Sequence, residues 1–171
     1  MSHQIEIGEY VVSAYLKHVE KCNVVDYKVR RPVQGIEAMN EIDVIGFHFE
    51  KRKVFLCEAK THIMGLYMGK SNKDTIVKIR DQYNNMKLYA DKYLKDFPNV
   101  EFQLWSPYVP IGVQTEAYKK MGGLELIINE NYTKRIRELE RIAGKTTKQD
   151  EIKVDTGNPF FRTLQILGHL R

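Results

Sequence analysis

The sequence is poor in cysteine and has no long apolar run. Of its 171 residues only two are cysteines, Cys22 and Cys57, which are too few for a disulfide framework or a four-cysteine zinc site. No stretch approaches the roughly 20 apolar residues that a membrane-spanning helix needs, and no signal peptide is recognisable at the N-terminus. These absences predict an intracellular, cytoplasmic protein without a membrane partner.

Internal repeats and low-complexity tracts are missing too, and neither sign of charge dominates strongly. The chain carries 27 Lys and Arg against 22 Asp and Glu, a formal net charge of +5, and 43% of its residues are hydrophobic. This apolar content is ample for the core of one domain of ordinary size. The positive balance favours a polyanionic partner without identifying one.

Three charged residues lie in two neighbouring apolar runs that are typical of β-strands. Asp43 lies in the first run, and Glu58 and Lys60 lie in the second. Side chains alternate between the faces of a strand, so Glu58 and Lys60 point to the same face. A two-residue hairpin loop at 50 and 51 would place Asp43 opposite Glu58, and one at 51 and 52 would place it opposite Lys60. Either register gathers the three charges on one face, whereas a three-residue loop without a bulge would not.

This grouping of charges needs a chemical reason, because acids are normally avoided on strands. Two carboxylates a few ångströms apart repel each other, and a hard divalent cation relieves the repulsion. Such a cation can also lower the pKa of a bound water and neutralise charge on a phosphate. We therefore predict that Asp43 and Glu58 bind a metal and that Lys60 acts on a phosphodiester or on the attacking water. These are the parts that phosphodiester hydrolysis needs.

The acid on one strand and the acid-x-Lys on the next, here Asp43 and Glu58-Ala59-Lys60, resemble the core motif of the restriction-endonuclease-like, or PD-(D/E)XK, nuclease superfamily. The context Glu-Ile-Asp-Val-Ile-Gly around Asp43 is similar to that of small resolvase-like and Mrr-like nucleases, although Ile42 stands where the family motif has Pro. The resemblance implies a Mg²⁺-dependent DNA endonuclease in which Mn²⁺ can substitute. It also implies that Asp43, Glu58 and Lys60 are the catalytic residues.

The periodicity of apolar residues predicts an α/β, or α+β, domain with a central β-sheet, and the family resemblance implies that this sheet is mixed. Expected are a helix at 4–22, strands at 24–33, 40–49 and 53–60, a helix at 73–96, a strand at 100–106, a helix at 113–121, a strand at 124–128 and a helix at 130–143. The two strands that carry the charges are apolar on both faces, which indicates helices on both sides of the sheet. The αβββαβ order resembles the nuclease family core over roughly residues 4–128.

The C-terminal part predicts a separate element. Residues 1–143 are expected to form the core domain, 144–157 a polar linker, and 158–171 an apolar helix that begins at Asn158-Pro159. This helix is too apolar to stay exposed, so it either closes the core or docks on a second copy. By analogy with small single-domain nucleases, which often pair to cut both strands, we predict a homodimer to which the helix contributes.

Glu9 is a further candidate residue, because it falls on the core-facing stripe of the first helix. A carboxylate aimed at a sheet is costly unless it is paired or bound to a metal. Glu9 therefore either forms a structural ion pair with Lys60 or Arg30 or, as the family resemblance implies, completes the metal site.

Three other residues have weaker signals. Gln82 lies on the flank of the long helix, where it is either a solvated residue or an accessory group that reaches the site. Lys70 and Lys73 lie in and just after the loop that leaves Lys60, which could hold DNA phosphates or simply pack over the end of the sheet.

A second class of function stays open beside the nuclease. A nucleic-acid-binding or scaffold protein could keep the same fold without activity. The intact set of Asp43, Glu58 and Lys60 favours the enzyme, because an inactive member would be expected to lose at least one of these charges.

Overall fold

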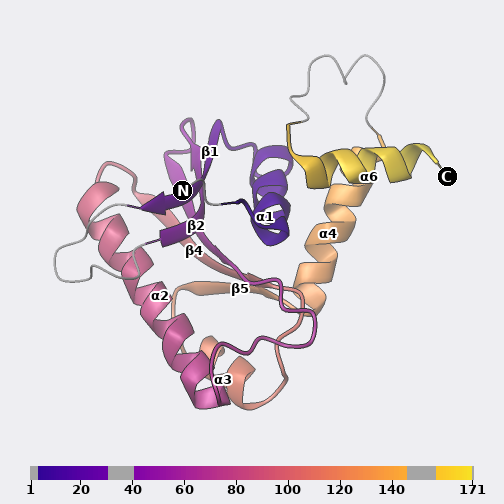
Figure 1. Cartoon of the computed structure of the whole chain (residues 1–171). Coiled ribbons are helices and arrows are strands. Elements are labelled where there is room, and N and C mark those ends of the chain that lie inside the picture. Colours follow the sequence, from indigo (N-terminus) through magenta and orange to yellow (C-terminus); the bar gives the residue numbers. More distant parts are fainter. Residues whose placement is uncertain (1–3, 31–40, 146–156, 171) are drawn as a thin grey trace.

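The computed structural model describes residues 4–30, 41–145 and 157–170 (Figure 1). These residues form, in chain order, α1 (Ile7–His18), β1 (Val24–Arg30), β2 (Glu41–His48), β3 (Lys53–Ala59), α2 (Asn72–Tyr93), β4 (Asn99–Ser106), α3 (Val113–Lys119), β5 (Leu124–Ile128), α4 (Glu130–Ala143) and α6 (Pro159–His169). The order of helices and strands expected from the sequence is confirmed.

The strands form one mixed sheet in the order β1-β2-β3-β4-β5. The first three strands are antiparallel neighbours, whereas β3, β4 and β5 run parallel. Parallel neighbours need a crossover connection, and α2 and α3 supply it. The carboxyl ends of β3 and β4 consequently lie at one edge of the sheet, where Ala59 pairs with Trp105. Just beyond, the Lys60 N–H donates to the Trp105 carbonyl at 2.8 Å.

Helices cover both faces of the sheet, as the apolar patterns of its central strands predict (Figure 1). On one face, Ile79 of α2 and Tyr118 of α3 are buried in the same cluster as Leu56 of β3. On the other face, Leu16 of α1 and Leu139 of α4 belong to a second buried cluster. Full burial of one such aliphatic side chain contributes roughly 1.5–3 kcal/mol. Both layers therefore help to fix the strands that carry the candidate site.

The first helix is shorter than predicted. It ends at His18 rather than near residue 22, because the chain reverses at Lys21, which has a left-handed φ of 60°. The Cys22 N–H then donates to the Leu16 carbonyl at 2.9 Å, and this contact directs the chain into β1. Of the strands predicted at 24–33 and 40–49, residues 31–33 and 40 lie outside the described residues.

The hairpin between β2 and β3 settles the register that the sequence left open. His48 pairs with Lys53 and Val44 pairs with Cys57, which is the register expected for a loop at 50 and 51. The two-residue loop itself is wrong, because the turn has four residues, 49–52, and ends at Arg52 with a φ of 47°. Continued by one residue, this register places Asp43 opposite Glu58.

The C-terminal helix α6 packs on its own chain. Phe161 is buried in the cluster formed with α1 and α4, and its ring stacks on His18 with centroids 3.7 Å apart. Asn158 caps the helix by accepting from the Phe161 N–H at 2.9 Å, and its amide donates to the Tyr10 carbonyl at 2.8 Å. Most of the predicted linker, residues 146–156, lies outside the described residues. Ile166, Leu167 and Leu170 at the C-terminal end nevertheless remain exposed, so α6 still offers apolar surface to a second copy. The homodimer stays a prediction, which sedimentation at micromolar concentration tests.

Candidate active site

An Asp from β2 and a Lys from the end of β3 meet at the centre of the candidate site. The Lys60 ammonium donates to Asp43 Oδ2 at 3.0 Å and also forms an ion pair with Glu58. The same Asp43 oxygen accepts a hydrogen bond from the Ala59 N–H at 2.9 Å, which ties the carboxylate to β3. The structure thus brings together the three residues on which the sequence prediction rests.

Burial and charge set the protonation of these groups. Glu58 is only 2% exposed, and desolvation, followed by the charge of Asp43, raises the pKa of its carboxyl to about 8. Burial acts to lower the pKa of Lys60, but the charges of Glu58 and Asp43 outweigh it and raise this pKa above its ordinary value. Lys60 is therefore charged at neutral pH, whereas the pKa of Glu58 is raised because burial and the charge of Asp43 outweigh its pairing with Lys60.

Glu9 reaches the same region from the first turn of α1. Its Oε2 accepts from the Glu6 N–H at 2.9 Å, which caps the helix, and its Oε1 forms an ion pair with Lys28 Nζ at 3.4 Å. The predicted ion pair with Lys60 or Arg30 is therefore replaced by one with Lys28. Desolvation, opposed by the Glu6 N–H and Lys28 and reinforced by Asp43, raises the pKa of Glu9.

Lys28 lies in β1 between two residues that keep the register with β2, and it has an unusual backbone conformation. Tyr27 pairs with Val44 and Val29 pairs with Ile42, and between them Lys28 has a left-handed φ of 48°. Such a φ is uncommon for a residue other than Gly and costs on the order of 1–3 kcal/mol, a strain that concentrates at functional sites. Sequence analysis missed Lys28, because the register of β1 on β2, which by its flanking pairs places Lys28 opposite Asp43, cannot be read from strand alternation alone.

Glu41 is the second residue that sequence analysis missed. Ligand atoms of Glu9, Glu41 and Asp43 lie within 4.8 Å of one another, close to the span that two ligands of one divalent ion cover. Glu41 stands two positions before Asp43, so strand alternation alone could have found it. Within the described residues Glu58 is not part of this group of three, although it was predicted as a ligand; it contacts Lys60 instead.

The donor set fits a hard cation. We call Glu9, Glu41, Asp43 and Glu58 the acidic cluster. In this cluster Lys28 forms an ion pair with Glu9, and Arg30 forms one with Glu41. Lys60 pairs with both Asp43 and Glu58. Carboxylate oxygens are the ligands that Mg²⁺, Mn²⁺ and Ca²⁺ prefer. The cluster has one carboxylate more than it has basic partners, and this excess agrees with the proton that Glu58 retains near neutral pH. A bound cation could take the place of that proton.

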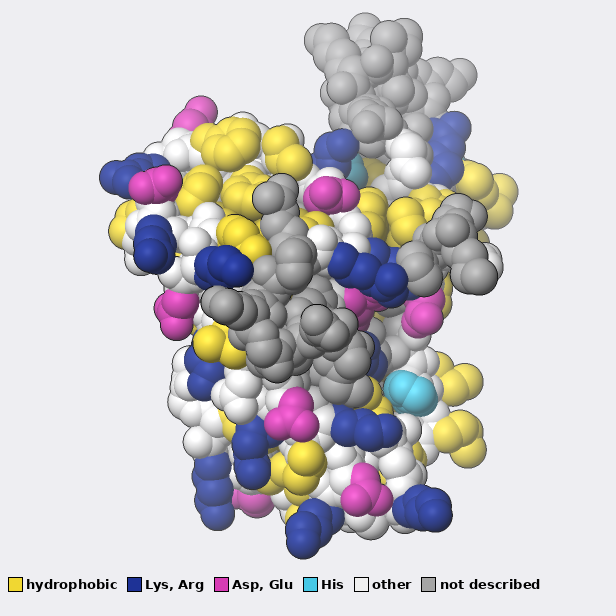
Figure 2. All heavy atoms as spheres, turned by 60° about the vertical axis from the view of Figure 1, so that its left-hand side comes forward, with side chains coloured by type: hydrophobic (Ala, Val, Ile, Leu, Met, Phe, Trp, Pro, Cys, Tyr) yellow, Lys and Arg dark blue, Asp and Glu magenta, His cyan; other side chains and the backbone are white. Residues whose placement is uncertain are grey.

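The remaining predicted residues are not joined to the acidic cluster by a contact that the structure shows. Gln82 lies on α2, and its side-chain oxygen is buried without a hydrogen-bond partner among the described residues. Lys70 and Lys73 are exposed beside and within the first turn of α2. Figure 2 shows Lys and Arg side chains spread over one face and interspersed with Asp and Glu. On that face, charge alone marks no single path for a nucleic acid.

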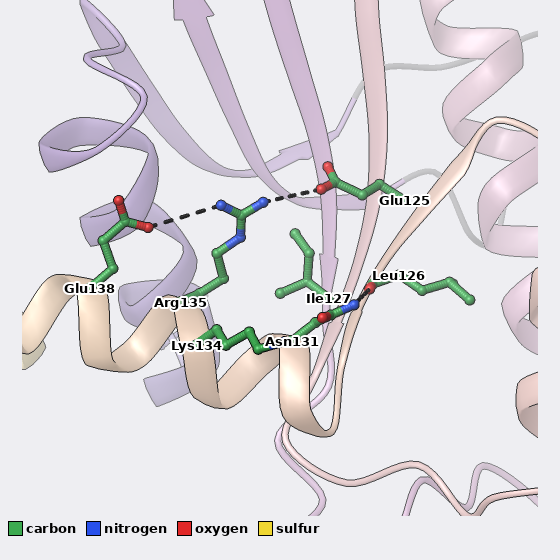
Figure 3. Close-up of a pocket in the computed structure, with 7 residues that line it drawn as sticks. All are labelled: Glu125, Leu126, Ile127, Asn131, Lys134, Arg135 and Glu138. Atoms are coloured by element: carbon green, nitrogen blue, oxygen red, sulfur yellow. Dashed lines mark hydrogen bonds and ion pairs between the residues drawn. The ribbon is translucent and has the colours of Figure 1, made fainter.

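A pocket of about 260 Å³ lies elsewhere, between β5 and α4 (Figure 3). Arg135 bridges it, with ion pairs to Glu125 at 3.3 Å and to Glu138 at 4.0 Å. Lys134, which also lines the pocket, pairs with Glu130 at 3.0 Å. The charged side chains that line this pocket are therefore ion-paired. The pocket is built by β5 and α4, whereas the acidic cluster is carried by α1, β2 and β3.

Comparison with known proteins adds no identification. The chain matches no family model, no curated protein and no solved structure. Among the helices of the described residues, none combines the length and the apolar character that crossing a membrane requires. The arguments for a function therefore come from the site itself.

Proposed function

We propose that this chain is a metal-dependent nuclease that hydrolyses phosphodiester bonds of DNA, with a restriction-endonuclease-like fold. The observation that carries the proposal is the contact of Asp43 on β2 with Lys60 after β3, with Glu58 paired to the same ammonium. An acid and an acid-x-Lys on adjacent strands meet here in a buried cluster. Glu9 and Glu41 add carboxylates to Asp43, as a site for a divalent cation requires.

Mg²⁺ is the proposed ion, with Mn²⁺ as a substitute. Asp43 would hold it together with Glu9 and Glu41, and Glu58 lies beside Asp43 as a further carboxylate. Such an ion, when bound, lowers the pKa of a coordinated water and neutralises charge on a phosphate. Hard oxygen ligands and the absence of Cys and His from this set favour Mg²⁺ and Mn²⁺ over softer metals.

The protein residues supply positioning and charge. Lys60 is charged at neutral pH, and Asp43 and Glu58 hold its ammonium in place. A preorganised positive charge in a poorly hydrated site stabilises negative charge that develops on a phosphate in the transition state. In the metal-free protein the pKa of Glu58 lies near 8. A cation bound beside it would lower this pKa, so Glu58 would then be available as a carboxylate, either as a metal ligand or as a proton acceptor.

One observation favours the non-catalytic alternative. Every carboxylate of the acidic cluster already contacts a basic side chain, and a structural ion-pair network would look similar. Incubation with plasmid, branched and single-stranded DNA, with Mg²⁺ or Mn²⁺ and with EDTA, separates the two. A nuclease cleaves DNA only when the ion is present, whereas an inactive nucleic-acid-binding or scaffold protein leaves every substrate uncut under all of these conditions.

A further inference from the structure

Two loops at the carboxyl ends of β3 and β4 expose large apolar side chains close together. We call these side chains the loop patch: Ile63, Met64, Tyr67, Tyr108, Ile111 and Val113. Ile63 and Met64 are 80% and 84% exposed, and Tyr67 and Tyr108 are 52% and 48% exposed. Val113 is the first residue of α3, and the other five lie on the two loops. Scattered single apolar residues on a surface are ordinary, but several on neighbouring loops suggest an interaction site.

The loop patch rests on an ordered base. Gly65, with a φ of 111°, lies between the two tyrosines: a Cβ there would be 2.7 Å from the Tyr67 ring and 3.5 Å from the Tyr108 ring. Beneath it, Leu66 is fully buried, and the Gln114 amide of α3 donates to the Leu66 carbonyl at 3.0 Å. The two tyrosine rings are therefore held near each other before any ligand binds.

The loop patch adjoins the acidic cluster. The loop starts at Thr61, directly after Lys60, and packs on α1 so closely that a Cβ on Gly8 would lie 2.5 Å from the Thr61 methyl group. Ile63 follows Lys60 by three residues, so their Cα atoms are at most about 11 Å apart. That is about three steps of a stacked base ladder at about 3.4 Å each. A DNA strand in the site would therefore pass close to Ile63, the residue of the loop patch that is nearest to Lys60 along the chain.

The charges around the loop patch suit a polyanion. Neither 61–73 nor 107–115 contains Asp or Glu, although the chain has 22 of them, whereas Lys70 and Lys73 lie in the first segment. Both lysines are exposed. Asp74 and Glu116 follow directly after the two segments, and the Lys70 N–H donates to Asp74 Oδ2 at 3.0 Å. Within the segments themselves the Asp, Glu, Lys and Arg class is represented by the two lysines alone, which suit the negative phosphates of a nucleic acid whose bases are apolar on their faces.

We propose that the loop patch binds unpaired bases, so that the enzyme acts on single-stranded or branched DNA in preference to intact duplex. This inference rests on the proposed nuclease function. Tyrosine rings stack on any base whose face is free, and aliphatic side chains such as Ile and Met wedge against unstacked bases. In an intact duplex the base faces are covered by their neighbours, so the rings would have no stacking partner unless the duplex opened.

The test measures binding separately from hydrolysis. A fluorescently labelled single strand and a matched hairpin duplex are titrated with full-length protein in EDTA, and affinity is read by anisotropy. The double variant Tyr67→Ala/Tyr108→Ala should bind the single strand about tenfold or more weakly, because stacking on an aromatic ring is worth about tenfold per base. Its affinity for the duplex should change by less than about twofold.

Two control variants isolate stacking. Tyr67→Phe/Tyr108→Phe keeps both rings and should bind the single strand as wild type does. Phe49→Ala removes a ring of similar exposure, 52%, from the turn at the opposite end of β3 and should have no effect. The inference is overturned if the alanine pair weakens both DNA forms equally or neither. It is also overturned if that pair dissociates a wild-type dimer in sedimentation while single-strand affinity stays unchanged, because the patch would then be an interface between copies.

Cleavage with Mg²⁺ distinguishes this inference from the proposed function. Faster cleavage of flap or single-stranded substrates than of intact duplex supports both. Equal rates on all substrates retain the nuclease and overturn the preference. Selective binding of single strands in EDTA without hydrolysis of any substrate overturns the nuclease and leaves the base-binding patch standing.

Discussion

Glu58 should make the stability of the metal-free protein fall as the pH rises. Its pKa is 4.5 ordinarily and about 8 in the fold. Between these values the unfolded chain has released this proton while the folded chain still holds it. The folded state therefore binds more protons, and the free energy of unfolding decreases with increasing pH across this window. Glu58→Gln removes the titration and keeps a neutral side chain of the same size.

The size of the effect follows from the pKa difference. At 1.36 kcal/mol per pKa unit, the shift from 4.5 to about 8 corresponds to at most roughly 4–5 kcal/mol of stability lost between about pH 4.5 and pH 8. Glu58 is almost fully buried, so bulk water screens little of this. The variant should match wild type within about 1 kcal/mol near pH 5 and exceed it by several kcal/mol near pH 8.5.

Urea unfolding in EDTA at both pH values measures this difference. Glu130→Gln, which removes a carboxylate whose side chain is 82% exposed, is the control and should change stability by less than about 0.5 kcal/mol at either pH. If wild type and Glu58→Gln keep the same stability difference at both pH values, Glu58 has an ordinary pKa. The statement that the acidic cluster has one carboxylate too many for its basic partners, and therefore retains a proton on Glu58, would then be wrong.

Three further outcomes are expected. Phe161→Ala should lower the free energy of unfolding by about 3–5 kcal/mol in urea titrations, because Phe161 fills the core beneath α6, whereas exposed Leu170 should tolerate Ala within about 0.5 kcal/mol; similar losses would contradict this packing. Lys60→Ala should slow turnover about a hundredfold or more with little change in DNA affinity, and equal losses would make Lys60 a binding residue only. Glu41→Gln should raise the half-saturating Mg²⁺ concentration of hydrolysis about tenfold, and an unchanged requirement would remove Glu41 from the metal site.

The sequence was informative where local periodicity decides the structure. Strand alternation placed Glu58 and Lys60 together, and the register of β2 and β3 agrees with one of the two hairpins considered. The apolar patterns of these strands also predicted helices on both faces of the sheet, because a strand that is apolar on both sides must be covered twice.

The parts that could not be predicted depend on backbone irregularity and on tertiary contacts. The left-handed φ of Arg52 is not encoded by Gly or Asn, so the four-residue turn could not be read from residue types. The partner of Glu9 depends on the register of β1 on β2 and on the packing of α1, which residue types do not give. The choice between the two locations of α6 rests on the fit of Phe161 against α1 and α4. Such a fit is a property of the packed core rather than of the segment.

Cleavage of DNA by Asp43→Asn and wild type is the most direct test of the proposed nuclease. Asn can still accept from the Ala59 N–H, as Asp43 does at 2.9 Å, so the fold should survive while the carboxylate that pairs with Lys60 and would hold the proposed metal is lost. The control Asp26→Asn removes an exposed acid from β1. We expect wild type and Asp26→Asn to cleave plasmid, branched or single-stranded DNA with Mg²⁺ and Asp43→Asn to cleave none. Full activity in Asp43→Asn, or no ion-dependent cleavage by folded wild type, would contradict the assignment.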